Sequence, residues 1–199
     1  MDTVAWISVT LYMQTQIATG FIRNPYRQRL LDILNGIFVR QSGQQGRFIE
    51  LSEVTIHTAD GKGERLANAY LNKCTVQLAT TPDVDLSRGI GGKAGPKFSP
   101  FQDKVRVPVR LSTPAYQVIG NMYRINHQNT WHVLEDRPMF LPVTEAEIRV
   151  LTNDECAKVT FVAVNKEQIL FLQEASLDQV SPKSLNLANG LLREVIFPK

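Results

Sequence analysis

The chain has 199 residues, of which 43% are hydrophobic and 21% charged, and its formal net charge is +3. This composition is typical of a folded globular protein and excludes an intrinsically disordered one. The two cysteines, Cys74 and Cys156, lack the spacing of metal ligands. We therefore expect free thiols in a reducing compartment.

The N-terminal segment VAWISVTLYM is apolar, but it lacks the basic start and the small-residue cleavage site of a signal peptide. Ile7, Val9 and Leu11 alternate with polar residues, which predicts a first strand. No apolar run approaches the roughly 18 residues of a membrane-spanning helix. A soluble, cytoplasmic protein with no membrane partner is the expectation.

A second strand is predicted over residues 17–22, with Gly20 marking a bend or a close backbone approach. Pro25 begins, and Asn35-Gly36 ends, a segment with a helical cluster of leucines and isoleucine, which predicts a short helix. The corresponding later segment, residues 125–135, fits a helix and a strand equally well.

The next predicted strand is FIELSEVTI, residues 48–56, followed by a loop rich in glycine. Apolar alternation on both sides of Asn72-Lys73 then predicts a β-hairpin with a two-residue turn. The same pattern recurs around Asn165-Lys166, which predicts a second hairpin.

The sequence contains an internal repeat, in which three blocks occur in the same order in both copies. Residues 7–34 match residues 107–134 at an offset of 100, and the strand at 48–56 matches 140–148 at an offset of 92. The two Asn-Lys pairs match at an offset of 93. Five short strands per copy predict two tandem small antiparallel barrels or rolled sheets, with a short helix in the first copy.

The repeat divides the chain into four segments. Residues 1–80 form the first small-β repeat, 81–104 a linker rich in glycine and proline, 105–175 the second repeat, and 176–199 a C-terminal cap or tail. The linker contains RGIGGKAG, which resembles a phosphate-binding loop. Ser87 and Ala94 stand where that motif needs glycine and serine or threonine, so nucleotide binding is not expected.

Residues 105–175 resemble the Sm-like family, and the first copy does so more loosely. Alternation in VRVPVRL is followed by matches to the first Sm motif, and VAVNKEQILFL is similar to the second motif. This resemblance implies a five-stranded barrel. The matching positions of the first motif are Gly120, Met122, Ile125, Asn126, Asn129, Thr130, Trp131 and Val133.

The chain departs from the family at the positions that contact RNA. Asn126, Thr130, Asn165 and Lys166 occupy them, and only Lys166 retains a charge. The chain also resembles uncharacterised bacterial domains with the motif R-L-x-D-x-L-N, which is present at residues 29–35. That second resemblance implies no activity.

Candidate catalytic residues are scarce. His57, His127 and His132 have no cysteine nearby to complete a metal site, and the pair His132 and Glu135 is more typical of a solvated helix surface. No G-x-S-x-G motif or catalytic cysteine signature is present. We expect no enzyme activity, cofactor or metal.

Two functional hypotheses remain open. Five arginines of the first copy, interleaved with aromatic residues, suit binding of RNA or single-stranded nucleic acid. Alternatively, exposed strand edges pair with neighbouring copies, and the protein is a self-oligomerising scaffold. The residues of the first hypothesis are Arg23, Tyr26, Arg27, Arg29, Phe38, Arg40 and Arg47.

Overall fold

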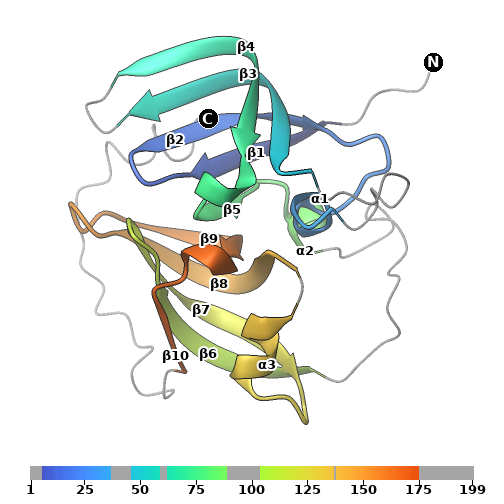
Figure 1. Cartoon of the computed structure of the whole chain (residues 1–199), viewed down its shortest axis with the longest axis vertical. Coiled ribbons are helices and arrows are strands. Elements are labelled where there is room, and N and C mark those ends of the chain that lie inside the picture. Colours follow the sequence, from blue (N-terminus) through green and yellow to red (C-terminus); the bar gives the residue numbers. More distant parts are fainter. Residues whose placement is uncertain (1–5, 37–45, 59–61, 89–103, 137, 175–199) are drawn as a thin grey trace.

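Figure 1 shows a computed structural model of the chain, which describes residues 6–36, 46–58, 62–88, 104–136 and 138–174. The protein is mainly β, and all strand pairs are antiparallel. Ten strands form one sheet in the order β10-β6-β7-β8-β9-β5-β1-β2-β3-β4. The sheet is not closed, because β10 and β4 lie at opposite ends of this order.

The elements of residues 6–88 pair among themselves in the order β5-β1-β2-β3-β4. They are β1 (Trp6–Tyr12), β2 (Gln16–Arg23), α1 (Leu30–Leu34), β3 (Phe48–Thr58), β4 (Gly63–Asn72), the 3-10 turn η1 (Lys73–Thr75), β5 (Leu78–Thr80) and α2 (Val84–Arg88).

The elements of residues 104–174 pair in the corresponding order, β10-β6-β7-β8-β9. They are β6 (Lys104–Ser112), β7 (Tyr116–Ile125), α3 (Thr130–Glu135), β8 (Phe140–Val150), β9 (Cys156–Asn165), the 3-10 turn η2 (Lys166–Gln168) and β10 (Phe171–Glu174). The two halves meet where β5 pairs with β9, at the middle of the molecule in Figure 1.

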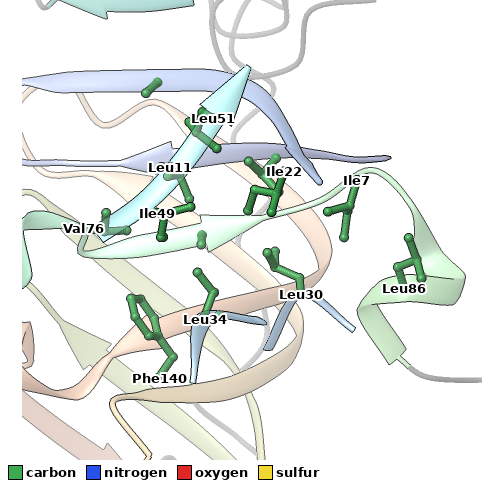
Figure 2. Packing of buried hydrophobic residues seen from close by; sticks show 14 of the residues in the cluster. Ile7, Leu11, Ile22, Leu30, Leu34, Ile49, Leu51, Val76, Leu86 and Phe140 are labelled. Atoms are coloured by element: carbon green, nitrogen blue, oxygen red, sulfur yellow. The ribbon is translucent and has the colours of Figure 1, made fainter. Parts of the chain in front are cut away.

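Strand alternation builds two hydrophobic cores. Ile7, Val9 and Leu11 of β1 are buried on one face, as the period of two predicts. Figure 2 shows Ile7 and Leu11 gathered with Leu30 and Leu34 of α1. The first core also contains Phe140 of β8, and the second core contains Tyr12 and Leu78 of the first half. Each core is therefore completed by residues of the other half.

A bulge bends the sheet at the same place in each half. The register of β2 with β3 shifts between Thr19 and Phe21, and that of β7 with β8 shifts between Ile119 and Asn121. A Cβ atom at Gly20 would lie 3.0 Å from the Ser52 carbonyl oxygen. The sequence-based prediction of a close backbone approach at Gly20 is thus confirmed. Glu53 and Glu145, with φ of 51° and 49°, complete the two bulges.

The prediction of β-hairpins at Asn72-Lys73 and Asn165-Lys166 is wrong. β4 and β5 do not pair with each other, and neither do β9 and β10. Instead, the side chains of Asn72 and Asn165 accept hydrogen bonds from the backbone N–H groups of Cys74 and Glu167, which caps the turns η1 and η2. The capped turn directs the chain away from the strand it has just formed. β5 consequently pairs with β1, and β10 with β6.

The helices differ from the sequence-based expectation. The helix predicted over Pro25–Gly36 is limited to α1, because the Asn24 side chain bonds the backbone of Gln28 and holds a turn before it. The ambiguous later segment forms the helix α3, and Asn129 caps its N-terminus. A third helix, α2, lies within the predicted linker, whose residues 89–103 are outside the described part of the chain. The predicted tail, 176–199, is likewise outside it.

Among the described residues, no helix has the length and hydropathy needed to cross a membrane.

Candidate functional site

The contact between β5 and β9 joins the two halves, and we call it the inner joint. Leu78 lies opposite Val164, and Ala79 lies opposite Ala163. The backbone N–H of Asn165 donates to the Gln77 carbonyl oxygen over 2.9 Å. Every residue of β9 from 161 to 165 is buried at this joint.

The buried amide of Asn165 strengthens the inner joint. Its Nδ2 group donates to the carbonyl oxygens of Lys73, at 3.1 Å, and Val76, at 2.8 Å. Its side-chain oxygen accepts from the Glu167 N–H at 3.0 Å. One side chain therefore caps η2 in its own half and holds η1 of the other half.

A second amide fixes β8 against α1. Asn35 ends α1, and its side chain accepts from the Phe140 N–H at 2.8 Å and donates to the Phe140 carbonyl oxygen at 3.0 Å. The Phe140 side chain packs in the first core with Leu34 (Figure 2), and it is 1% exposed. The first helix thus covers the end of β8.

Polar contacts continue across the joint near β7. The Gln77 side-chain oxygen accepts from Thr113 Oγ1 at 2.7 Å and from the Ala115 N–H at 3.0 Å. The Tyr116 hydroxyl donates to the Met13 carbonyl oxygen at 3.1 Å, and its ring meets that of Tyr12 edge to face. Burial raises the pKa of Tyr116 to about 12 and raises that of Tyr12 as well.

In each half a lysine contacts the C-terminus of a helix, α1 in the first half and α3 in the second. Lys73 Nζ donates to the Leu34 carbonyl oxygen at 3.1 Å, and Lys166 Nζ donates to the Leu134 carbonyl oxygen at 2.9 Å. Desolvation lowers the pKa of both amines, and nearby charges oppose the shift. Positive charge there satisfies carbonyls that a helix leaves unpaired at its end.

The two end strands of the sheet, β4 and β10, pair with β3 and β6 on one side, and among the described residues no strand pairs with their other side. Large hydrophobic side chains lie exposed at both. Tyr70 of β4 is 69% exposed, and Leu170 and Phe171 at β10 are 67% and 48% exposed. We call these regions the β4 edge and the β10 edge. Strand edges of this kind present unpaired N–H and C=O groups that favour pairing with another chain.

Phe48 has the same position relative to the β4 edge that Phe140 has relative to the inner joint. Phe48 lies opposite Asn72 in the pairing of β3 with β4, and Phe140 lies opposite Asn165 in the pairing of β8 with β9. Phe140 is buried under α1, whereas Phe48 is 60% exposed. The same register therefore produces a covered site at the inner joint and an uncovered one at the β4 edge.

The residues proposed for nucleic-acid binding are only partly available. Arg29 forms an ion pair with Asp32, with Nε 2.6 Å from Oδ2. Arg23, Arg27 and Arg47 are exposed, as is Tyr26, but they come from a strand end, a turn and a loop. Phe38 and Arg40 lie outside the described residues. Nucleic-acid binding through this cluster stays a prediction.

The positions that match RNA contacts of the Sm-like family are largely engaged in the fold. Asn165 is buried in the inner joint, and the Lys166 amine binds the end of α3. Thr130 is buried and donates to a carboxylate oxygen of Glu174. Asn126 is exposed in the turn that follows β7.

No group of three metal-ligating side chains occurs in the part of the chain that the structure describes. His132 takes part in the cap of α3, where its Nδ1 accepts from the Asn129 N–H. Cys74 and Cys156 are free cysteines.

Exposed strand edges were predicted from the sequence, but the exposed aromatic side chains of Phe48 and Tyr70 were not. The signal available in the sequence was an aromatic residue near the end of a predicted strand.

Comparison with protein-family models, with curated proteins and with solved structures finds no match to this chain.

Proposed function

We propose that the protein is a non-catalytic assembly module, a scaffold that binds further copies of itself through the β4 and β10 edges. The inner joint carries the proposal. It is a strand-to-strand contact between two halves with corresponding strand orders, and the strands equivalent to its two sides are the ones left open at the sheet ends.

The corresponding halves support a tandem origin from one small-β unit of Sm-like architecture. Strand order, bulge position, capped 3-10 turn and helix-binding lysine recur in both halves. A unit that associates through its last two strands can add units at either end. In this proposal the chain contains one such contact within itself and forms the next with another copy.

The chemistry of the open edges also favours assembly. Exposed hydrophobic side chains lie at both edges, Tyr70 at the β4 edge and Leu170 and Phe171 at the β10 edge. Their contact with water is unfavourable, and contact with a second apolar edge would bury them. Lysine or proline, which commonly protects an open strand edge, is absent from β4 and β10. Both edges are therefore suited to form strand ladders.

Light scattering during size exclusion, at several protein concentrations, tests the proposal. We expect a mass that is a multiple of 22.4 kDa and that rises with concentration. Tyr70→Lys places a charge on the β4 edge and should reduce the mass to that of one chain, whereas Glu64→Lys, at the far end of β4, serves as the control. A single-chain mass at every concentration would refute assembly.

The same elution peak tests the nucleic-acid hypothesis. Absorbance at 260 nm above that expected for the protein, lost at high salt, would favour the arginine cluster over self-assembly. A protein-like ratio of absorbance at 260 and 280 nm in an oligomeric peak would favour the scaffold.

A further inference from the structure

We propose that β4 of one copy pairs with β10 of the next copy, antiparallel and in the register of the inner joint. We call this contact the outer joint. It rests on the proposed function, because it specifies how copies of the chain would assemble. The partner is a second copy of this chain, joined head to tail.

The register follows from strand positions within each half. Leu51 lies opposite Ala69 as Val143 lies opposite Val162, and Leu11 lies opposite Ala79 as Leu111 lies opposite Leu172. Leu71 and Tyr70 thus correspond to Val164 and Ala163, while Phe171 and Leu172 correspond to Leu78 and Ala79. The outer joint therefore places Leu71 opposite Phe171 and Tyr70 opposite Leu172.

Asn72 has an unused donor that fits this register. Its side-chain oxygen accepts from the Cys74 N–H at 3.0 Å, as that of Asn165 accepts from Glu167. The Asn165 Nδ2 group additionally makes two bonds across the inner joint, but among the described residues Asn72 Nδ2 makes none. In the outer joint it would donate to the carbonyl oxygens of Lys166 and Ile169 of the next copy, which correspond to those of Lys73 and Val76.

Phe48 and α3 are complementary in the same way. At the inner joint, Phe140 packs with Leu34 of α1, and both side chains are almost fully buried. Leu134 of α3 corresponds to Leu34 but is only partly buried. The outer joint would lay the exposed Phe48 of one copy against α3 of the next, which removes apolar surface of both from water.

The two joints differ in their side chains. The pair Ala163 and Ala79 of the inner joint is replaced by Tyr70 and Leu172, so the outer joint is bulkier and more apolar. At the inner joint Asn35 bonds the backbone of Phe140, the residue that corresponds to Phe48. Glu135 is the residue that corresponds to Asn35 at the outer joint. Its carboxylate accepts a hydrogen bond from a backbone N–H but cannot donate one. The outer joint would thus have fewer polar contacts than the inner joint.

Disulfide cross-linking tests the register. In a background of Cys74→Ser and Cys156→Ser, Leu71→Cys is combined with Phe171→Cys. Because the Asn165 N–H bonds Gln77, the neighbouring pair Leu78 and Val164 does not exchange ladder hydrogen bonds. Cα atoms of such pairs lie about 4.5 Å apart, which suits a disulfide. The β4 and β10 edges of one chain lie at opposite ends of the sheet, so the disulfide must join two chains.

We expect covalent dimers and higher species from this double variant after oxidation, and only single chains after reduction in denaturant. Two controls have the same background. Leu71→Cys alone reports pairing of β4 with β4, and Leu71→Cys combined with Gln173→Cys reports a register shifted by two residues. Both should yield few cross-links.

Light scattering under reducing conditions separates the possible failures. Oligomers without cross-linking of the matched pair, or with stronger cross-linking of a control, would overturn the register but leave self-assembly intact. Absence of oligomers would overturn both. Cross-linking that appears only after removal of residues 176–199 would assign the edge to that segment of the chain and would also overturn the proposal.

Discussion

Phe48 and Phe140 are the same residue type in the same strand register, and they differ in what covers them. Phe140 is enclosed by the first core, so Phe140→Ala leaves a cavity and should lower the free energy of unfolding by about 3–5 kcal/mol. Phe48→Ala removes an exposed ring and should change it by less than about 0.5 kcal/mol.

Urea denaturation at a concentration where the protein is a single chain measures this difference. Light scattering at higher concentration should reverse the order of effects on assembly, with Phe48→Ala lowering the mass. Equal destabilisation by both substitutions would contradict the exposure of Phe48.

Gly120 is a position at which any side chain would collide with the neighbouring strand. A Cβ atom there would lie 2.7 Å from Val143 Cγ1 and 3.0 Å from the Thr144 carbonyl oxygen. Gly120→Ala should therefore lower the free energy of unfolding by about 1–3 kcal/mol. Gly20→Ala, whose nearest side-chain atom is 3.5 Å away, is the matched control and should cost less. A larger effect at Gly20 in thermal unfolding would contradict this account.

At the residue scale, the core positions could be predicted from the sequence more readily than the exposure of residues at the strand edges. Alternation identified Ile7, Val9 and Leu11, because burial on one face of a strand follows the period of two. It could not separate Phe48 from Phe140, since both occupy the same pattern. Their difference arises from α1, which covers only one of them.

At the scale of elements, the two capped 3-10 turns decide which strands meet. Asn165→Ala removes the cap of η2 and also two bonds to η1 across the inner joint, leaving buried carbonyls without that donor. It should cost about 1–3 kcal/mol of stability. Asn72→Ala removes only a cap in a dilute single chain and should cost less.

Urea denaturation of both variants tests this comparison. An equal cost for the two substitutions would show that the bonds across the inner joint contribute little.

The tyrosines packed across β1 and β7 predict a response to alkaline pH. The pKa of Tyr116 is raised to about 12, so the unfolded chain loses this proton first, near pH 10. Stability from Tyr116 is complete below pH 10 and should fall, by about 2–3 kcal/mol, as pH rises toward 12. The lowered pKa values of Lys73 and Lys166 act in the opposite direction, because unfolding there takes up protons.

Comparison with Tyr116→Phe isolates the tyrosine. The variant should be less stable than the natural chain below pH 10, since it loses the bond to Met13, and the difference should shrink above pH 10. A difference that is independent of pH in chemical denaturation would contradict the raised pKa.

The elements themselves were only partly predictable. The Asn-Lys pairs were interpreted as hairpin turns because two strands flank them, but local pattern does not specify which strands pair. The capping role of each asparagine depends on a turn that the sequence does not show. α3 was left ambiguous, although Asn129 three residues before His132 is a capping pattern that favours the helix.

At the scale of the molecule, the structure is one open sheet. Its middle contact joins β5 to β9, and the strands that correspond to these two, β10 and β4, are its ends. The repeat in the sequence predicted five strands in each part, and the described residues contain five strands in each half. Closed barrels were not found, because the sheet continues from β9 to β5 instead of closing within each half. That continuation depends on buried contacts between residues far apart in sequence, such as Asn35 with Phe140.

The most direct test of head-to-tail assembly is a mixing experiment with two edge variants. Tyr70→Lys blocks the β4 edge, and Leu170→Lys blocks the β10 edge, while both substitutions lie at exposed positions. Each variant alone should elute with the mass of one chain in light scattering. An equal mixture should form a dimer, because one intact edge of each type remains. Monomers in the mixture, or oligomers of either variant alone, would contradict the assembly through β4 and β10.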